Sequence, residues 1–540
     1  MPDRISPLIL FRNQTFRSLW IAALASNFGG LVQAVGAAWL MTSLSESQNM
    51  VALVQGSVAL PIMIFSLLAG VFADNFDRRR VMLIAQSFMF GVSILLTFEG
   101  WLTPWLLLAF TFSIGCGTAL HNPSWQATMG DIVSREELPS AVSLNSMGFN
   151  LMRSIGPAAG GAIVAIAGAA AAFAVNALSY VAIILALLRW KAPLRDTHLP
   201  REPMGSAFSA GLRYVAMSPN LMRVILRGFW FGLSAIALLA LLPVVVRETL
   251  QATAFVYGIM LGCFGMGAVF GALTNAALRA RFRNEIIARG GFVGFALSCV
   301  VLAVSTHPAL SGGALMLAGA CWVLSLSMFN VTIQLSTPRW VVGRVIALYQ
   351  TGTFGGMAAG SLIWGIVADR GGPEVALAGA SVMLLIGALI GLPLPLPEFS
   401  GLNLDPLNRF KEPDTRFDLS YRSGPVMVMV DYEIAQSDVP EFLAAMSLRR
   451  RVRIRDGAQQ WALLRDLHRP EHWSESYHVP TWAEYVRHNE RRTNADAELS
   501  DQLRRLHRGE TPPEVHRMIE RQTVPLRDDM LQKEGASDAA

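Results

Sequence analysis

Charged residues and cysteines are scarce in this sequence. Only 15% of its 540 residues are charged, while 53% are hydrophobic, and four are cysteines. Because soluble domains carry about 25% charged residues, the composition excludes an ordinary soluble protein over most of the chain. The cysteines each lie alone in an apolar segment, at Cys116, Cys263, Cys299 and Cys321. Their isolation favours small packing residues over disulfide, redox or metal-binding roles.

Motifs for catalysis and cofactor binding are also missing. No phosphate-binding loop of the form G-x-x-x-x-G-K-S/T occurs, and no group of residues has the spacing of a nucleophile or metal site. Direct use of ATP is therefore not expected. The net charge of +5 averages an apolar region and a charged one, so it does not indicate a nucleic acid partner. We predict no cofactor, no metal and no enzymatic activity.

Long apolar segments recur from Leu19 to Leu396, with short polar breaks between them. A helix needs roughly 20 apolar residues to cross a bilayer core of about 30 Å, and these segments are long enough. Arginines gather in the loops after the even-numbered segments, whereas the opposite loops offer only Arg247 and Arg370. By the positive-inside rule both termini are cytoplasmic. We predict an all-α, multi-pass protein of the bacterial cytoplasmic membrane, with about twelve spans in contact with the lipid bilayer.

One pattern of small, polar and basic residues occurs twice in the apolar region, at the same spacing. Its members are Gly70, Asp74 and Arg78, and then Gly271, Asn275 and Arg279. Repetition of this kind indicates two related halves with a substrate site between them near mid-membrane. We predict an N-terminal six-helix half at 1–190, a cytoplasmic linker at 191–220 and a C-terminal six-helix half at 221–396.

The loop from Gly70 to Arg80 reads G-V-F-A-D-N-F-D-R-R-R. It resembles the signature loop of the major facilitator superfamily, G-x-x-x-D-x-x-G-R-R/K-R/K, with Asp77 in place of the usual glycine. In that family the loop latches the cytoplasmic side in one access state. The resemblance assigns this role to Gly70, Asp74, Arg78, Arg79 and Arg80. The alternative is that the arginines only anchor the topology.

A second motif, Gly156, Pro157, Gly160 and Gly161, resembles the G-P-x-x-G-G end of a motif typical of drug and solute exporters. Proline removes a backbone donor and glycine permits close packing, so the motif predicts a bend in its helix. The upstream glycines of the full motif are absent. Over about residues 8–395 the chain resembles the branch that contains enterobactin and macrolide exporters. That resemblance implies a secondary transporter that exports a small siderophore-like or drug-like molecule by alternating access.

Few ionisable residues fall inside the predicted spans, and such residues are candidates for function. Arg153 is a candidate contact for an anionic substrate, and the alternative is a structural arginine bonded to helix carbonyls or to Asp131. His121 is a candidate proton carrier or a cavity-lining residue, while coupling through Asp74 or Asp131, or uncoupled export, stays open. Further candidates share polar side chains on cavity-lining spans: Asn27, Gln33, Gln126, Asn330 and Gln334. For each of these, hydrogen bonding between helices is the alternative.

After a linker at 397–423 the chain becomes charged and no segment is long enough to span. Residues 424–522 show the β-α-β-β-α order of a ferredoxin-like α+β domain, and 523–540 are predicted to be a disordered tail. The domain resembles the αβ-barrel family that includes antibiotic-biosynthesis monooxygenases. The resemblance implies self-association or ligand sensing, with catalysis as the alternative. The whole chain would then be a membrane-tethered enzyme or sensor in place of an exporter.

Overall fold

The computed structural model describes residues 7–520, except 76, 135–136, 191–203, 398–403, 405–406, 408–409 and 418. The chain divides into two compact units. The first comprises residues 1–194, 220–333 and 346–398, and the second comprises 195–219, 334–345 and 399–540. The predicted tail at 523–540 lies outside the described residues, as does much of the predicted linker at 191–220.

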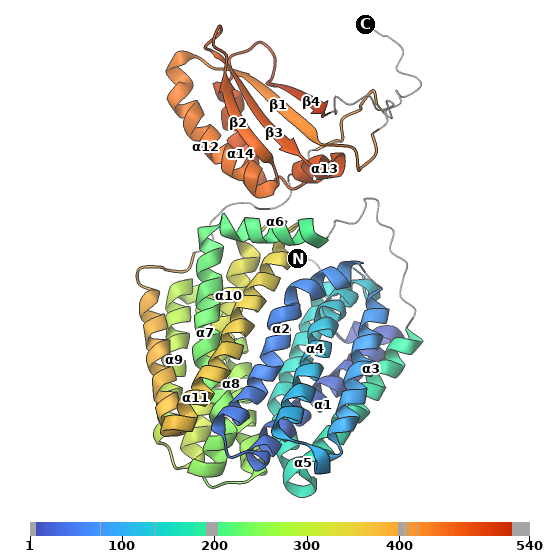
Figure 1. Cartoon of the computed structure of the whole chain (residues 1–540), viewed down its shortest axis with the longest axis vertical. Helices are drawn as coiled ribbons and strands as arrows, with labels where there is room; N and C mark the ends of the chain where they lie inside the picture. The colour runs from blue at the N-terminus through green and yellow to red at the C-terminus, as the bar shows by residue number, and fades with distance from the viewer. Residues whose placement is uncertain are drawn as a thin grey trace. The chain divides into compact units, whose positions relative to one another are not determined.

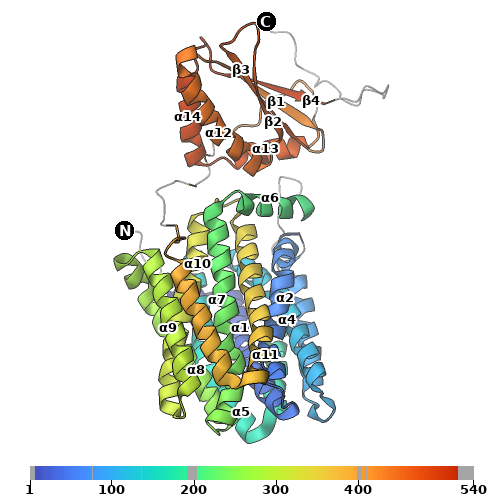
Figure 2. The same ribbon diagram turned by 60° about the vertical axis from the view of Figure 1, so that its left-hand side comes forward.

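The first unit is a bundle of long helices, in which α1 to α5 lie on one side and α7 to α11 on the other (Figure 1; Figure 2). Its elements are the 3-10 helices η1 (Pro7–Arg12) and η2 (Glu99–Trp101), the π-helical turn η3 (Val245–Thr249), and the α-helices α1 (Gln14–Leu44), α2 (Gln48–Asn75), α3 (Arg78–Leu96), α4 (Pro104–Ile132), α5 (Leu138–Arg189), α7 (Pro219–Val244), α8 (Ala254–Arg281), α9 (Asn284–Val304), α10 (Pro308–Leu335) and α11 (Val342–Ile390). The predicted six-helix halves at 1–190 and 221–396 stay a prediction, and we call the two sets of helices the N-terminal and the C-terminal half.

Polar residues fix where several of these helices begin. The Asn13 side chain accepts hydrogen bonds from the backbone N–H groups of Thr15 and Phe16 at the start of α1. Thr103 does the same for Leu106 at the start of α4, where Pro104 occupies the first turn. Such caps satisfy backbone donors that have no partner within the helix. The helices therefore begin where a short polar side chain precedes an apolar run.

Ten helices among the described residues are long and apolar enough to cross a membrane. The prediction of a mostly helical, multi-pass membrane protein is thereby confirmed. Two of the ten are unusually long, because α5 has 52 residues and α11 has 49. Each contains one glycine with a positive φ, Gly168 at 80° and Gly372 at 85°. Glycine adopts this conformation without a steric penalty, so the chain turns there while the flanking residues stay helical.

The second unit contains a four-stranded sheet with helices packed on it. Its elements are α6 (Met204–Ala216), β1 (Val426–Glu433), η4 (Gln436–Asp438), α12 (Val439–Asp456), β2 (Gln459–Arg465), β3 (His472–Val479), α13 (Trp482–Glu490), α14 (Asn494–Leu506) and β4 (Glu514–Ile519). The strand order is β2-β3-β1-β4 and every pair is antiparallel. Alternate residues of β1, from Val426 to Tyr432, are buried in a core shared with α12, α13 and α14.

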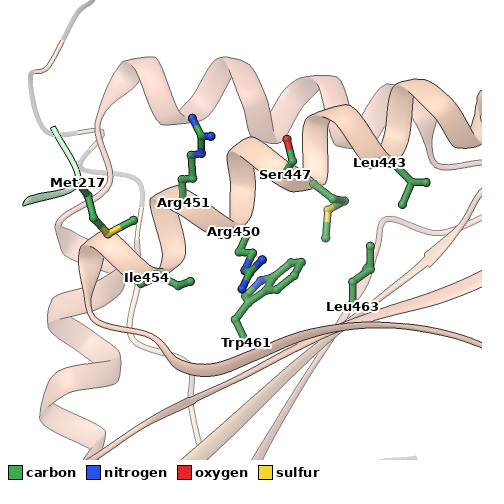
Figure 3. Close-up of a pocket in the computed structure, with 9 residues that line it drawn as sticks. Met217, Leu443, Ser447, Arg450, Arg451, Ile454, Trp461 and Leu463 are labelled. Atoms are coloured by element: carbon green, nitrogen blue, oxygen red, sulfur yellow. The ribbon is translucent and has the colours of Figure 1, made fainter. Parts of the chain in front are cut away.

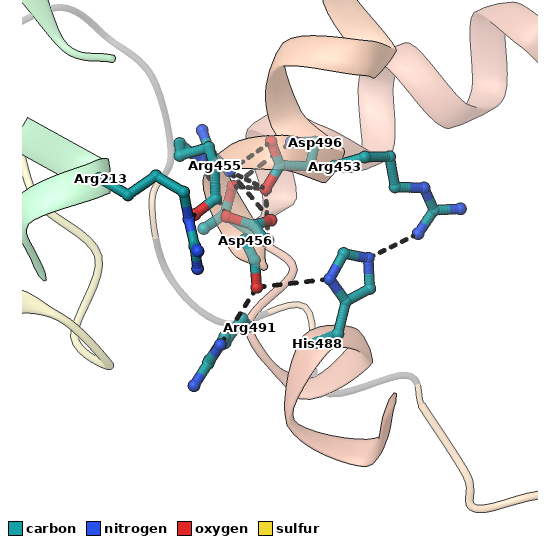
Figure 4. Close-up of polar contacts among 8 residues, drawn as sticks. Arg213, Arg453, Arg455, Asp456, His488, Arg491 and Asp496 are labelled. Carbon is teal, nitrogen blue, oxygen red and sulfur yellow. Dashed lines mark hydrogen bonds and ion pairs between the residues drawn. The ribbon is translucent and has the colours of Figure 1, made fainter. Parts of the chain in front are cut away.

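Residues from two other parts of the chain join the second unit. The Arg213 Nε of α6 donates to the Arg455 carbonyl oxygen at 3.3 Å (Figure 4). The Arg455 guanidinium lies 5.4 Å from the Tyr214 ring. The Arg491 guanidinium lies 4.5 Å from the ring of Trp340, in the connection between α10 and α11. Arginine stacked on an aromatic ring stabilises a contact by about 0.5–2 kcal/mol. The sequence did not predict this association.

Candidate functional site

The two halves of the first unit touch backbone to backbone where α5 meets α8. A Cβ atom added to Gly161 would lie 2.6 Å from the Ala254 carbonyl oxygen and 2.7 Å from the Gly258 Cα. A Cβ added to Gly265 would lie 2.5 Å from the Arg153 carbonyl oxygen. No side chain fits at these distances. Glycine is therefore required on both helices for the halves to approach this closely.

The other glycines of the exporter-like motif face α1. A Cβ on Gly156 would lie 2.9 Å from the Leu31 Cβ, and one on Gly160 would lie 2.9 Å from the Val32 Cα. The backbone of α5 stays helical through Gly156 and Pro157, and Gly168 is its one non-helical residue. The predicted bend stays a prediction, while the glycines of the motif make close contacts with α1 and α8. In this structure α5 packs between α1 and α8.

The halves meet a second time between α2 and α11. The hydroxyl groups of Ser66 and Thr351 are 2.8 Å apart, and Ser66 also donates to the Ala347 carbonyl oxygen at 3.3 Å. A Cβ on Gly56 would lie 3.2 Å from the Ser361 Cβ. The α5–α8 and α2–α11 contacts correspond to each other under the internal repeat. A substrate site between related halves is bounded by contacts of this kind.

Polar contacts join the halves at the end of the bundle where α1 turns into α2, which we call the distal end. The Asp369 carboxylate accepts hydrogen bonds from the Ser47 hydroxyl at 2.9 Å and from the Asn49 backbone N–H at 3.0 Å. The Gln48 amide donates to Glu248 at 3.0 Å. Arg247 donates to the carbonyl and hydroxyl oxygens of Thr42. Since each bond crosses from one half to the other, the distal end is closed in this structure.

Arg153 lies at the α5–α8 contact, where no carboxylate of the described residues neutralises its charge. Its guanidinium lies 5.6 Å from the ring of Phe264 on α8, and that ring meets Trp322 edge-on at 6.0 Å. Asp131, the carboxylate considered as its partner, instead accepts a hydrogen bond from Arg78 at 3.0 Å. Among the described residues no carboxylate pairs with Arg153. A cation at membrane depth with an aromatic neighbour and no counterion is a candidate binding group for an anion.

His121 lies on α4 and stacks on Trp125, with ring centroids 6.3 Å apart and planes 13° apart. The Trp125 indole N–H in turn donates to Asn145 at 3.2 Å. The Nδ1 atom of His121 is buried without a hydrogen-bond partner among the described residues. In the described part of the chain no carboxylate contacts the imidazole. The packing therefore gives this side chain a fixed orientation without a visible proton relay.

The predicted polar candidates fall into different surroundings. Gln33 is buried, and its Oε1 accepts hydrogen bonds from Ser93 at 2.7 Å and from Asn176. This favours the alternative of hydrogen bonding between helices, because α1, α3 and α5 are joined there. Asn27 and Asn330 are half-buried, whereas Gln126 and Gln334 are exposed. Gln334 groups with the second unit rather than the first.

In the signature loop, the side chains of Gly70 and Asp74 lie outside the described residues. Besides the Arg78–Asp131 pair, Arg79 donates to the carbonyl oxygens of Leu187 and Leu188, at 2.8 Å each, near the end of α5. Arg80 is exposed and lies 3.6 Å from Asp77. The described part of the loop thus links α3 to α4 and to α5 within the N-terminal half.

A family model described as transmembrane secretion effector matches residues 5–523. The chain belongs to this family of major facilitator transporters. It is 24% identical over 408 residues to an uncharacterized major-facilitator-type transporter of Bacillus subtilis, covering 71% of this chain and 94% of the relative. It is 27% identical to the enterobactin exporter of Salmonella choleraesuis, covering 64% of this chain and 82% of that protein. These relatives are transporters, so the prediction that the protein is not an enzyme is confirmed.

Two further proteins are similar to this chain, one in sequence and one in fold. The staphyloferrin A transporter of Staphylococcus aureus is 24% identical over 45% of this chain and 62% of its own length. A bacterial homologue of the human lysosomal transporter Spinster, solved in an inward-facing, occupied conformation, superposes with a TM-score of 0.59 at 13% identity. The superposition covers 71% of this chain and 96% of the homologue. At that identity the likeness shows the fold alone.

Asp77, where this chain departs from the family's usual glycine, caps α3. Its carboxylate accepts hydrogen bonds from the backbone N–H groups of Arg79 and Arg80. We expect Asp77→Ala to lower the unfolding free energy by about 0.5–2 kcal/mol, because it removes a cap. Asp77→Gly should cost only a few tenths of a kcal/mol. Thermal unfolding of the purified variants in one detergent measures the difference, and equal losses for alanine and glycine would contradict the capping role.

A buried ion pair in the C-terminal half was not predicted from the sequence. Arg227 on α7 is 5% exposed and pairs with Glu285 at the start of α9. The Glu285 carboxylate also accepts a hydrogen bond from the Leu396 backbone N–H at 2.8 Å. The sequence could have indicated this pair, because it places an arginine inside one apolar segment and a glutamate at the edge of another. The pair fastens the chain beyond α11 to the bundle, which is a structural role.

Proposed function

We propose that this transporter exports an amphipathic organic anion of siderophore-like or drug-like size across the cytoplasmic membrane by alternating access. The observation that supports this most directly is Arg153 at the contact between the halves, which pairs with no carboxylate in the described part of the chain. The names of two relatives, an enterobactin exporter and a staphyloferrin A transporter, agree with a siderophore-like substrate. A membrane-tethered enzyme is not favoured, because the family and the relatives are transporters.

The chemistry of Arg153 explains why an anion is proposed. A charge at the depth of the bilayer is costly, so such residues face the bundle interior and usually pair with an opposite charge. Guanidinium presents several donors in a planar fork that matches a carboxylate or a related oxyanion. Phe264 beside it offers an apolar surface. An amphipathic anion would supply both the missing charge and an apolar contact.

Alternating access requires a protein that closes on one side at a time. We propose that the closed distal end faces outward and that the termini are cytoplasmic, because the distal loops predicted from sequence carry only Arg247 and Arg370. We further propose that α5 and α11 each cross twice, with Gly168 and Gly372 at the turns, which gives the predicted count of twelve. Gly70, Asp74 and Arg78 to Arg80 remain the proposed cytoplasmic latch.

We propose that the sheet and helices of the second unit form a ferredoxin-like domain. In support, its strands and helices follow one another as β-α-β-β-α-β when α13 and α14 are counted together, and its strand order is β2-β3-β1-β4. Self-association through this sheet, and the boundaries 397–423 and 424–522, remain proposals. Proton coupling through His121 is also a proposal. The remaining candidate substrate contacts are Asn27, Gln126, Asn330 and Gln334.

Substitution of Arg153 tests the proposed function. We expect Arg153→Gln to slow efflux of the anionic dye fluorescein by about tenfold or more, because a charge-assisted, bidentate contact is lost. Arg153→Lys should restore part of the rate, since it keeps the charge without the fork. Efflux of an uncharged dye such as Nile red should change little. Rates would be measured in energised cells that express equal amounts of each variant.

Arg189→Gln is the matched control, because this arginine lies exposed at the end of the same helix. It should leave both rates unchanged. Equal loss of anionic and neutral efflux in Arg153→Gln would contradict the anion proposal and would indicate a structural arginine.

A further inference from the structure

The second unit contains a cavity between α12 and the edge strand β2. It has a volume of about 470 Å³, within the usual range for small-molecule sites. Its apolar walls come from Leu443 and Ile454 on α12 and from Trp461 and Leu463 on β2 (Figure 3). Met217, which precedes α7 in the chain, lies at one side. None of these residues belongs to a membrane-crossing helix, so the cavity is separate from the proposed transport route.

A hydrogen bond to a buried carboxylate fixes the orientation of Trp461 in this cavity. Its indole N–H donates to the Glu475 carboxylate at 3.0 Å. Glu475 is fully buried and is held in turn by Arg453 at 3.1 Å and Arg449 at 3.4 Å. Burial would raise the pKa of Glu475, but the two guanidiniums and the indole bond outweigh this and lower it to about 2. The acceptor therefore stays ionised at neutral pH, and the indole ring stays in place without a ligand.

Two arginines of α12 give the cavity a positive charge. Arg450 lies over the Trp461 ring at 5.7 Å, and Arg451 also lines the cavity, with its side chain directed away from Trp461 (Figure 3). The neighbouring Arg449, Arg453 and Arg455 each pair with a carboxylate. Among the described residues Arg450 and Arg451 pair with none. Positive charge is thus left uncompensated at the one side of α12 that also borders an apolar hollow.

We propose that this cavity binds a small aromatic carboxylate or a similar amphipathic anion. The oxyanion would take hydrogen bonds from Arg450, as guanidinium favours, and Arg451 would add positive charge at the edge of the cavity. The aromatic body would lie against Trp461, Ile454 and Leu463. Preformed apolar walls with a few placed polar groups are the usual design of a small-molecule site. Since Met217 borders the cavity and α7 begins at Pro219, the bound anion would touch the segment that joins α6 to the C-terminal half.

Equilibrium dialysis of radiolabelled 1-naphthoate against the full chain in lipid nanodiscs tests the proposal. Empty nanodiscs provide the background, and the neutral analogue 1-naphthalenemethanol is the second probe. We expect saturable binding of naphthoate that the double variant Arg450→Gln with Arg451→Gln weakens by about tenfold or more. Weak binding of the neutral analogue should not change. Ser447→Trp, on the exposed surface of α12 at the cavity, should abolish naphthoate binding by filling the space.

Arg505→Gln is the matched control, because Arg505 is an exposed arginine of α14 away from the cavity. Circular dichroism and thermal unfolding show whether each variant is folded, and Ser447→Trp supplies a test that leaves every charge in place. Absence of saturable naphthoate binding would overturn the proposal. So would binding that survives both the double variant and Ser447→Trp, because such binding would belong to the membrane unit, where an Arg153→Gln variant would remove it.

Discussion

Replacement of Gly161 by isoleucine should abolish export. An added side chain at this position meets the Ala254 carbonyl oxygen and the Gly258 backbone within 2.7 Å. Backbone atoms cannot move aside as a flexible side chain can, and overpacking of a fitted interface costs about 1–3 kcal/mol or more. The two halves would then be unable to close at the distal end. We expect the transport rate to fall by more than about tenfold, since each 1.4 kcal/mol changes an equilibrium tenfold.

The variant should be trapped with its distal end open, which can be measured separately from transport. A cysteine introduced at Ser47, where Asp369 of the other half accepts a hydrogen bond, should react faster with an impermeant maleimide in the Gly161→Ile background. Gly91→Ile is the matched control, because nothing lies within 4 Å of a Cβ atom on that α3 glycine. Normal transport by Gly161→Ile, or unchanged labelling, would show that the α5–α8 contact is dispensable.

The same motif shows what sequence could and could not predict. Gly156, Pro157, Gly160 and Gly161 were recognised as a site of close packing from residue type alone. Which neighbour each glycine meets depends on the rotation of α5 about its axis. The sequence offers little information on that rotation, because α5 is apolar around its circumference. The backbone keeps helical φ and ψ angles at Pro157, and the helical geometry breaks at Gly168.

Pairing between distant segments was equally hard to predict. Asp131 was considered as a partner for Arg153, and the structure pairs it with Arg78, which is 53 residues away in the chain. Gln33 was placed among the cavity candidates, and it joins helices inside the N-terminal half. Hydropathy gives the depth of a residue in the membrane. It does not give the face of a helix that is apolar on all sides, and contacts depend on that face.

The soluble elements were easier, because their periodicity is clear. Alternate residues of β1, from Val426 to Tyr432, are buried, and this alternation is visible in the sequence. The order predicted for this domain has one helix after its third strand, whereas Arg491 to Thr493 separates α13 from α14 and Thr493 caps the second. No local pattern predicted that Tyr214 and Trp340 would pack on Arg455 and Arg491. These contacts join residues far apart in the chain.

Substitution of Glu475 by glutamine should destabilise the sheet unit by about 3–5 kcal/mol, because removing one partner of a buried ion pair leaves the other charges uncompensated. Glu475 is fully buried between Arg449 and Arg453, and it also accepts the Trp461 N–H. His488 cannot take over the charge balance. Burial and the adjacent Arg453 hold the pKa of His488 well below its ordinary value, so the ring is neutral. Hydrogen exchange of the β3 amides in the full chain measures the loss, and Glu510→Gln, at an exposed position, should change it little.

Acid should remove the same stabilisation from the unchanged protein. The pKa of Glu475 falls from an ordinary 4.5 to about 2 in the folded state. Its contribution, roughly 3 kcal/mol at 1.36 kcal/mol per pH unit, is therefore complete above the unfolded pKa and declines as the pH falls from about 4.5 toward 2. Exchange of the β3 amides, corrected for intrinsic rates, should accelerate across that window in the natural sequence and much less in Glu475→Gln. If exchange accelerated equally in both proteins between pH 4.5 and 2, the acid sensitivity would belong to other carboxylates. The buried Glu475 would then not be the group that fixes Trp461 and the cavity beside it.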